Sequence, residues 1–409
     1  MHDSPEGRFP IPERDDMPNA SGAPIKVLSV FGTRPEAIKM APVLAELERH
    51  GDVFASQVCV SGQHREMLDQ MLELFKIRPD FDLDVMQPEQ TLTDLTVAVL
   101  DGLGPILAVE KPDWVLVQGD TTTTMAASLA AFYHGIPVGH VEAGLRTHTM
   151  REPRPEEMNR RVSAVLADLH FAPSAEAAEN LLAEGIAPDR VFVTGNTVID
   201  AFQQASALPF DVARSSLAGV PYEGKRLIVV TAHRRENFRH DMLEICEALK
   251  LVAEAHDDVH LVCPVHLNPN VQAPFYALLE GIENVTLLPP VGYREMVWLL
   301  QQCSFLITDS GGLQEEAAAI GKPVLVLRNV TERPEPAASG TTRLVGSKKD
   351  ALVAAAFELL ANDAVYYEMA RPVSPYGTGD AAKRIVELLI AHSRVGSSSV
   401  PAVDVLEAG

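Results

Sequence analysis

The sequence predicts an α/β protein of two tandem Rossmann-like domains, each with a doubly wound parallel sheet. Three observations support this fold class. Short apolar runs alternate with helical patterns along the chain, the alternation pauses over residues 208–224 and then restarts, and 409 residues exceed one ordinary hydrophobic core. Two such domains would face a cleft with the C-terminal ends of their strands, where open α/β sheets bind ligands.

The individual elements follow from the pattern of apolar residues. Short uninterrupted apolar runs are typical of strands that are buried on both faces. In the first half of the chain they predict strands at residues 25–31, 55–60, 114–117, 137–141, 169–172 and 191–193, with helices at 38–50, 65–75, 123–134 and 156–166. In the second half they predict strands at residues 226–231, 259–264, 285–288, 305–308 and 323–327, and an amphipathic final helix at 381–394.

These elements divide the chain into domains. Residues 1–24 are rich in proline and charge, and we expect them to be a disordered leader. The first domain should span residues 25–205 and be completed by a C-terminal helix at 378–395. The second domain should span residues 206–377, and residues 396–409 should form a loose tail.

Composition excludes several classes of function. Fifty-six acidic and 34 basic residues give a formal net charge of −22, which disfavours binding to nucleic acid and anionic membranes. The chain has no apolar run of about 18 residues that would predict a membrane-spanning helix, and no apolar core of a secretory signal. Four cysteines without a CxxC pair predict no metal site and free thiols in a reducing compartment, the cytoplasm.

The first polar motif, FGTRPE, follows the first predicted strand. Gly32 permits a tight turn, Pro35 suits the first helical position, and Arg34 stands at a helix N-terminus, where the backbone favours an anion. A capped turn with a solvated arginine is the alternative. The motif is not GxGxxG, so it does not favour a nicotinamide cofactor.

Carboxylates follow further elements of the first domain. Asp120, in GDTTTT, is either a helix N-cap or, with the four hydroxyls after it, part of a sugar-binding surface. Glu142 comes directly after an apolar strand and either faces the cleft or pairs with Arg146. Glu156 and Arg160 have the i,i+4 spacing of a helical ion pair. Together the three acids favour proton-transfer chemistry.

Polar residues also end the first strands of the second domain. His233 is followed by Arg234 and Arg235, which favours an anion site over a purely structural histidine. His266 ends the next predicted strand, in the motif PVHLNPN.

The motif TDSGGLQEEA is the strongest single pattern. Ser310, Gly311 and Gly312 lie between a strand and a helix, so bare backbone and a helix N-terminus can approach a phosphate. Glu316, one turn further, is placed to bind the vicinal diol of a ribose, and Arg333 stands in a loop that could close over the ligand. The pattern predicts a nucleoside-diphosphate site in the second domain; a simple capped helix is the alternative.

The chain resembles the non-hydrolysing UDP-N-acetylglucosamine 2-epimerase family in ten motifs that run in order from about residue 26 to residue 390. They are FGTRPEAIKMAP, GQHREMLDQ, GDTTTT, GHVEAGLRT, PEEMNR, GNTVID, HRREN, PVHLNPNV, TDSGGLQEEA and GKPVLVLRNVTERPE. The resemblance implies the two-domain fold of many nucleotide-sugar glycosyltransferases (GT-B-like). It also implies a cytoplasmic homodimer that interconverts UDP-GlcNAc and UDP-ManNAc, needs no nicotinamide or other cofactor, and supplies ManNAc units for cell-surface polysaccharide.

The resemblance implies elimination of UDP, a bound 2-acetamidoglucal and re-addition of UDP with a proton delivered to the other face of C2. By this resemblance the catalytic residues are Asp120, Glu142, Glu156 and His233. Asp120 and Glu142 would be the proton shuttles at C2, Glu156 would steady charge or orient Arg160, and His233 would help the departing phosphate.

The resemblance also assigns binding residues. Those for the substrate are Arg34, Lys39, Arg160, Ser310, Gly311, Gly312, Glu316 and Arg333, with the diphosphate on Arg34 and residues 310–312, and the ribose on Glu316. A second UDP-GlcNAc, bound as an allosteric activator, would contact Gln63, Arg234 and His266. Glu66, close to Gln63, is a glutamine in some members.

Three other functions fit parts of the pattern. A glycosyltransferase of the same fold would use UDP-GlcNAc to modify an acceptor, but it would not need three carboxylates and a histidine. A hydrolysing epimerase would release free ManNAc and UDP, and the absence of a fused kinase domain favours the non-hydrolysing form. A non-catalytic nucleotide-sugar sensor would have lost Asp120, Glu142 or His233, and all three are present.

Overall fold

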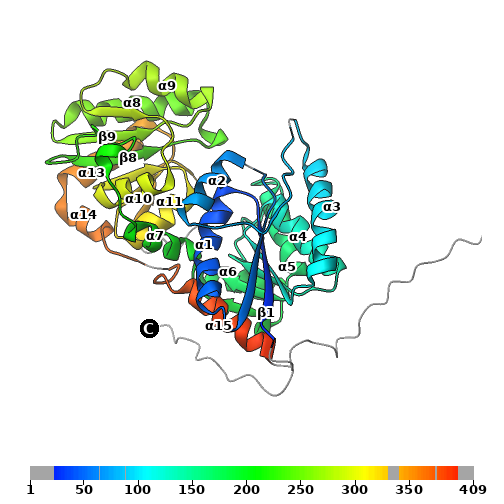
Figure 1. Cartoon of the computed structure of the whole chain (residues 1–409). Helices are drawn as coiled ribbons and strands as arrows, with labels where there is room; N and C mark the ends of the chain where they lie inside the picture. The colour runs from blue at the N-terminus through cyan, green and yellow to red at the C-terminus, as the bar shows by residue number, and fades with distance from the viewer. Residues whose placement is uncertain (1–22, 64, 88, 330–339, 374, 395–409) are drawn as a thin grey trace, which may run out of the picture. The chain divides into compact units, whose positions relative to one another are not determined.

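The computed structural model describes residues 23–63, 65–87, 89–329, 340–373 and 375–394, and it divides into two compact units (Figure 1). The first unit comprises the chain up to Thr194 and the C-terminal segment from Ala381, and the second runs from Gly195 to Asp380. Each unit is built on one parallel sheet, which confirms the predicted two-domain α/β fold. The predicted tail, and the leader apart from its last two residues, lie outside the described residues.

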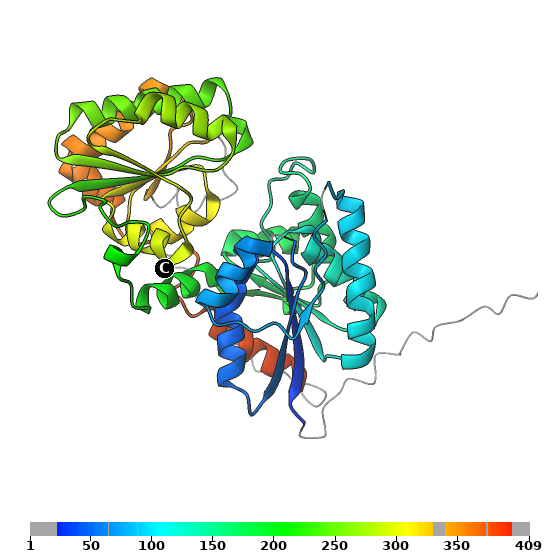
Figure 2. The ribbon, with the colours of Figure 1, turned by 45° about the horizontal axis from the view of Figure 1, so that its top comes forward.

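The first unit holds a seven-stranded sheet in the order β3-β2-β1-β4-β5-β6-β7, with every neighbouring pair parallel. Its strands are β1 Ile25–Phe31, β2 Phe54–Val60, β3 Phe81–Asp82, β4 Trp114–Gln118, β5 Val138–Val141, β6 Leu169–Ala172 and β7 Val191–Val193. Its α-helices are α1 Arg34–Arg49, α2 Arg65–Leu74, α3 Leu92–Glu110, α4 Thr122–Tyr133, α5 Glu156–Leu166, α6 Ala175–Ala183 and α15 Ala381–Arg394. Helices α1 and α15 pack together on one face, and α3, α4 and α5 on the other (Figures 1 and 2).

Strand β1 shows why the sequence forms this sheet. Every residue of IKVLSVF except Lys26 is buried, as expected of a parallel strand covered on both faces. The strand order reverses between β1 and its neighbour β4. The loops after these two strands therefore flank a topological switch point, the position at which open α/β sheets bind ligands.

Helix α3 was absent from the sequence-based assignment. Gly102, Gly104 and Pro105 lie inside it, and these residue types weaken a helical pattern. Its length and composition alone would suffice to cross a membrane, with a mean hydropathy of 1.6 over an 18-residue window, contrary to the expectation of no such helix. In the structure α3 packs against α4, and its buried side chains include Leu103 and Leu107 in the core beneath it.

The second unit holds a six-stranded parallel sheet in the order β10-β9-β8-β11-β12-β13. Its strands are β8 Arg226–Thr231, β9 Val259–Pro264, β10 Val285–Leu288, β11 Phe305–Thr308, β12 Val324–Val326 and β13 Thr342–Leu344. Its α-helices are α7 Thr197–Ala207, α8 His240–Ala255, α9 Pro269–Leu279, α10 Tyr293–Gln302, α11 Gly311–Ala319, α13 Lys349–Ala361 and α14 Asp363–Met369. The switch point of this sheet lies between β8 and β11.

The boundary between the units differs from the sequence-based position between residues 205 and 206. The structure divides the chain between Thr194 and Gly195. The reason is that α7 packs against α10 and α11 of the second unit. The helical pattern of residues 197–207 predicts that a helix forms there, but it does not show which of the two units the helix packs against.

Candidate active site

A buried carboxylate joins the two switch-point loops of the first unit. Glu36, in the first turn of α1, is 1% exposed and accepts hydrogen bonds from the backbone N–H groups of Gly32 (2.9 Å) and Thr33 (2.8 Å). It also accepts from the hydroxyls of Thr121 (2.6 Å) and Thr124 (3.0 Å), which follow β4. Burial raises the pKa of Glu36, and the hydrogen bond from Thr121 is the first of several that oppose this rise.

This arrangement corrects the interpretation of GDTTTT as a sugar-binding surface. Thr122, Thr123 and Thr124 are buried. Thr123 Oγ1 donates to Gln63 Oε1 (3.1 Å) and lies 2.9 Å from Ser61 Oγ. Internal hydrogen bonds therefore account for the hydroxyls of Thr121, Thr123 and Thr124. Gln63, which the resemblance assigns to an activator site, lies beside the loop that follows β4.

Glu142 lies directly after β5 and is held from two sides. It is 8% exposed and has a φ of 63°, which is uncommon for a residue other than glycine. Lys39 Nζ of α1 pairs with its Oε1, and Gln118 Nε2 at the end of β4 donates to its Oε2. Arg146, the alternative partner, forms a two-pronged ion pair with Glu184 (2.9 and 2.7 Å).

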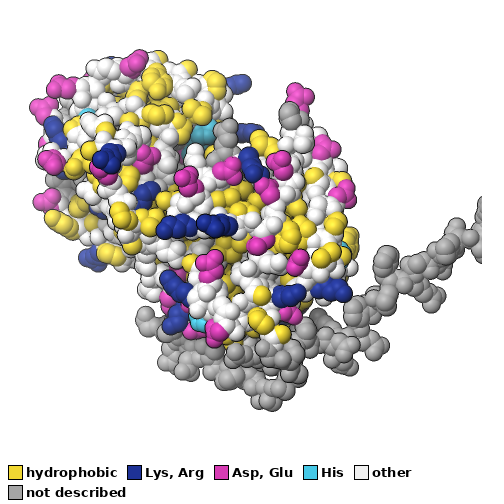
Figure 3. All heavy atoms as spheres, viewed as in Figure 1, with side chains coloured by type: hydrophobic (Ala, Val, Ile, Leu, Met, Phe, Trp, Pro, Cys, Tyr) yellow, Lys and Arg dark blue, Asp and Glu magenta, His cyan; other side chains and the backbone are white. Residues whose placement is uncertain are grey.

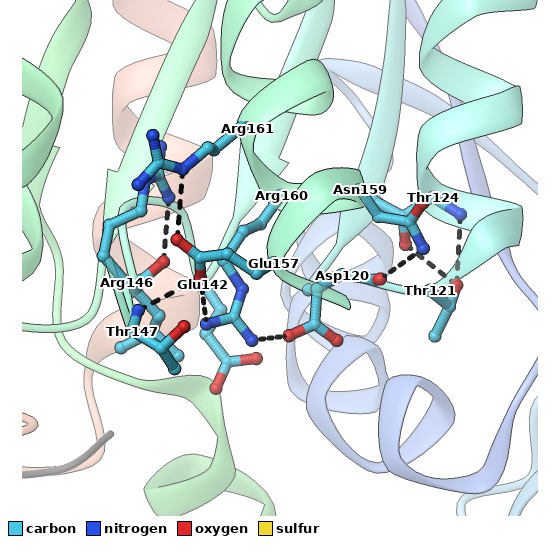
Figure 4. Close-up of polar contacts among 12 residues, drawn as sticks. Asp120, Thr121, Thr124, Glu142, Arg146, Thr147, Glu157, Asn159, Arg160 and Arg161 are labelled. Atoms are coloured by element: carbon cyan, nitrogen blue, oxygen red, sulfur yellow. Dashed lines mark hydrogen bonds and ion pairs between the residues drawn. The ribbon is translucent and has the colours of Figure 1, made fainter. Parts of the chain in front are cut away.

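Asp120 follows β4 and pairs with Arg160 of α5 (Figure 4). Arg160 Nη2 donates to Asp120 Oδ2, and Asn159 Nδ2 donates to the backbone carbonyl of Asp120 at 2.9 Å. The Asp120 side chain is 30% exposed, whereas that of Arg160 is 6% exposed. Asp120 is not the helix N-cap, because Thr121 caps α4. Its carboxylate is therefore accessible to solvent and rests on a buried cation.

Glu142 lies beside the loop that carries Asp120. Glu142 Oε2 is 3.6 Å from the position that a Cβ would take on Gly119, the residue before Asp120. A buried histidine holds this glycine, since His140 Nε2 lies 2.7 Å from the Gly119 carbonyl oxygen. Burial lowers the pKa of His140 to about 4, so the ring is neutral near pH 7 and donates to that carbonyl. On the adjacent strand, burial lowers the pKa of His170 to about 3.

The predicted pair of Glu156 with Arg160 is replaced by a pair with the next residue. Glu157 is fully buried and accepts from Arg160 Nη1 (3.3 Å), Arg161 Nε (3.1 Å) and the Thr147 backbone N–H (3.0 Å) (Figure 4). Glu156 Oε2, in contrast, is a buried atom with no hydrogen-bond partner among the described residues. Glu157, whose carboxylate is engaged in three hydrogen bonds, and Glu156, which has an oxygen without a described partner, are thus neighbours in sequence.

In the second unit, a buried carboxylate, Asp309, likewise joins the loops after the two switch-point strands, β8 and β11. It is fully buried directly after β11 and accepts hydrogen bonds from the backbone N–H groups of His233 and Arg234, each at 2.9 Å. The His233 ring stacks on that of His266, with centroids 5.8 Å apart. The structure therefore brings His233, Arg234 and His266 together at the ends of adjacent strands.

Helix α11 begins at the predicted diphosphate motif. Ser310 is its N-cap but makes no side-chain capping hydrogen bond. A Cβ on Gly312 would meet no atom within 4 Å, so space beside the first turn is open to a ligand. The backbone N–H groups of such a turn attract phosphate.

Glu316, in α11, is buried and hydrogen-bonded to a tyrosine. It is 3% exposed and accepts from the Tyr293 hydroxyl at 2.9 Å. Burial first, and then Glu316, raises the pKa of Tyr293, which keeps this phenol neutral as a donor. Arg34 is the first residue of α1 and is partly exposed. Arg333 lies outside the described residues.

Sequence reasoning missed four side chains that position the site: Glu36, Gln118, Glu157 and Asp309. A capping-box pattern, Thr33 followed three residues later by Glu36, would have indicated the first. The other three have no spacing signal that separates them from their polar neighbours. Within the described ranges, no group of three or more His, Cys, Asp or Glu residues could hold a metal ion.

Comparison with known proteins places these features in a family. The sequence profile of UDP-N-acetylglucosamine 2-epimerase matches residues 45–390. The chain is 52% identical over 370 residues to the UDP-N-acetylglucosamine 2-epimerase of Escherichia coli K12, covering 89% of this chain and 98% of the relative. A Neisseria meningitidis UDP-GlcNAc 2-epimerase structure bound to UDP-GlcNAc has a TM-score of 0.83 and 47% identity, with 90% and 100% of the two chains covered. A Listeria monocytogenes structure described as a UDP-N-acetylglucosamine 2-epimerase also has a TM-score of 0.83, with 46% identity and coverage of 90% and 97%. The chain belongs to the UDP-N-acetylglucosamine 2-epimerase family.

Proposed function

We propose that this protein is a non-hydrolysing isomerase that interconverts UDP-GlcNAc and UDP-ManNAc. The observation that carries the proposal is the pair of carboxylates at the ends of adjacent strands, Asp120 and Glu142, each against its own buried cation. An epimerisation needs a base on one face of a carbon atom and an acid on the other. Membership of the family supports the substrate, and the product would supply ManNAc units for cell-surface polysaccharide.

The proposed reaction begins at C1 of the sugar. C2 is not next to a carbonyl group, so its proton becomes acidic only as the C1–O bond breaks and UDP departs. A base then takes the C2 proton, which leaves 2-acetamidoglucal. UDP returns to C1 while an acid delivers a proton to the other face of C2. Asp120 and Glu142 are the proposed shuttles. Glu156, whose buried Oε2 has no hydrogen-bond partner among the described residues, steadies the charge that develops.

The leaving diphosphate needs positive charge and backbone donors. We assign it to the N-terminus of α11 at Ser310, Gly311 and Gly312, with help from His233 and Arg34. The open space beside Gly312 supports this assignment. Lys39 and Arg160, each bound to a carboxylate, add positive charge near the sugar. Glu316, held by Tyr293, is assigned to the ribose, and Arg333 to a closing loop.

Deuterium incorporation tests this reaction. Incubated with UDP-GlcNAc alone in D₂O, the protein is expected to form UDP-ManNAc and to place deuterium at C2 of both epimers, because the proton is exchanged with solvent. NMR of the sugar products measures both outcomes. Interconversion without deuterium at C2 would contradict elimination, and free ManNAc with UDP would indicate a hydrolysing enzyme. A glycosyltransferase would leave UDP-GlcNAc without an epimer in this assay, because it transfers the sugar to an acceptor, which is absent.

Further assignments accompany this function. A second UDP-GlcNAc is proposed as an activator that contacts Gln63, Arg234 and His266. The reaction is proposed to need no nicotinamide or metal and to take place in the cytoplasm, without nucleic acid or membrane. In the face shown in Figure 3, Lys and Arg side chains stand in small groups among Asp and Glu, which suits a protein with a net charge of −22.

A homodimer is proposed because the α3–α4 layer exposes apolar side chains. Val97 and Val109 of α3 are 49% and 76% exposed, and Phe132 and Tyr133 of α4 are 59% and 71% exposed. Phe132 and Tyr133 have ring centroids 6.4 Å apart, and adjoining exposed apolar groups are a feature of interfaces. The double variant Val97→Glu/Phe132→Glu should sediment as a 44.3 kDa monomer while the natural protein sediments at twice that mass. Tyr367→Glu, at a 68% exposed tyrosine of the second unit, is the control. A double variant that remains dimeric would place the interface elsewhere.

A further inference from the structure

The two carboxylate oxygens of Asp309 differ in their contacts: Oδ2 holds the loop after β8, and Oδ1 takes no part in this. Oδ2 accepts three hydrogen bonds, from the backbone N–H groups of His233 and Arg234 (2.9 Å each) and from Asn237 Nδ2 (3.0 Å). These bonds tie the loop after β8 to the end of β11. Oδ1 is buried and accepts no well-aligned hydrogen bond among the described residues.

Oδ1 of Asp309 faces an imidazole. His233 Nδ1 lies 3.2 Å from Asp309 Oδ1, within the range of an ion pair. The His233 side chain is 40% exposed, so one edge of the ring meets the buried carboxylate while the ring remains accessible. His266 stacks against its face at an interplanar angle of 25°, and Arg234 Nε donates to the Asp309 backbone carbonyl at 3.0 Å. The ring of His233 therefore contacts the Asp309 carboxylate at one edge and the His266 ring at one face.

A buried carboxylate oxygen without a donor is unfavourable, and Nδ1–H is the donor that the geometry supplies. With the proton on Nδ1, the neutral ring carries its lone pair on Nε2, on the other side of Cε1. We propose that Asp309 is a positioning residue that fixes His233 in the Nδ1–H form and stabilises its imidazolium. This inference rests on the proposed function, in which His233 assists the departing diphosphate of UDP. As the imidazolium, His233 would present Nε2–H to a phosphate oxygen.

Asp309→Asn separates the structural role from the positioning role. If the amide oxygen takes the place of Oδ2, it keeps all three hydrogen bonds to the loop. The amide nitrogen then donates to His233 Nδ1, which forces the ring proton to Nε2. In the Ser-His-Asp triad, the same kind of exchange leaves geometry intact and lowers turnover by about 10⁴-fold. Here kcat should fall by about 10²–10⁴-fold, with little change in KM.

Nitrogen-15 NMR of histidine-labelled full-length protein reads the tautomer directly, with His233 assigned from the signal lost in His233→Gln. We expect Nδ1–H in the neutral ring of the natural protein and Nε2–H in Asp309→Asn. Asn237→Ala removes the hydrogen bonds of Asn237 Nδ2 to Asp309 Oδ2 and to the Leu327 carbonyl without touching the ring. It should lower the melting temperature but retain the Nδ1–H tautomer and kcat within about threefold.

Two results would overturn the inference: an Nε2–H tautomer in the natural protein, or the same tautomer in Asp309→Asn as in the natural protein. Measurement on the natural protein decides the first even if the variant fails to fold. Failure of the proposed function gives a different result, because the natural protein would then leave UDP-GlcNAc unchanged whatever the tautomer of His233.

Discussion

Glu142→Gln should lower turnover of UDP-GlcNAc by about 10²–10⁴-fold, the usual size of a lost general acid or base. The substitution keeps the shape of the side chain and removes its capacity to exchange a proton at C2. It also removes the anion beside Lys39, so the variant should melt at a lower temperature. UDP affinity, measured by titration calorimetry, should change little because the diphosphate is assigned to the N-terminus of α11.

Glu46→Gln provides the matched control for Glu142. Glu46 is a residue of α1, is equally buried at 8% exposure, and pairs with Arg49 at 2.6 Å. Its substitution removes a similar carboxylate away from the strand ends and should leave turnover near its natural value. If Glu142→Gln keeps near-full activity while Glu46→Gln behaves as expected, Glu142 only holds Lys39, and Asp120 must act with another group.

Glu157→Gln should have the largest effect on stability, a loss of about 3–5 kcal/mol in the free energy of unfolding. The fully buried Glu157 carboxylate is shared by Arg160 and Arg161, and its neutralisation leaves these cations without part of their counter-charge. For a unit of roughly 200 residues, this loss corresponds to a fall of about 6–20 °C in melting temperature. Calorimetric melting of the full chain measures the change.

The neighbouring substitution, Glu156→Gln, separates stability from chemistry. It alters a carboxylate of similar position whose Oε2 has no hydrogen-bond partner among the described residues. The melting temperature should change by no more than about 2 °C, while turnover falls by about 10²-fold or more. Equal destabilisation by the two variants would contradict the division of roles, and full activity of Glu156→Gln would remove Glu156 from the catalytic set.

Most strands were predictable because parallel strands buried on both faces leave uninterrupted apolar runs. The short edge strands β3 and β13 were not predicted, since two or three residues, most of them partly exposed, leave no such run. Helix α3 was not, since Gly102, Gly104 and Pro105 mask its pattern, and the boundary at Thr194 was not, since α7 is assigned by packing alone.

The site residues were found as residue types after strands, but their partners were not. The i,i+4 spacing favoured Glu156 as the ion-pair partner of Arg160. The partner in the structure is Glu157, one residue further along the helix, whose side chain is buried. Glu36 accepts a hydrogen bond from Thr121, and Asp309 accepts one from the His233 backbone N–H. Both donors lie far away in sequence, so a local pattern cannot show which oxygen meets which donor.

The return of α15 to the first unit has a consequence for how the chain is made. Helix α15 packs on α1, and Trp114 Nε1 of β4 donates to Ser393 Oγ at 2.8 Å. On the ribosome, all of the second unit is synthesised before α15 emerges, because residues 195–380 form an insertion within the first unit. Domains commonly fold in the order of their synthesis. Here the unit that starts first is finished last, so its α1 face stays uncovered during translation, and a chain truncated before Ala381 would expose that face permanently.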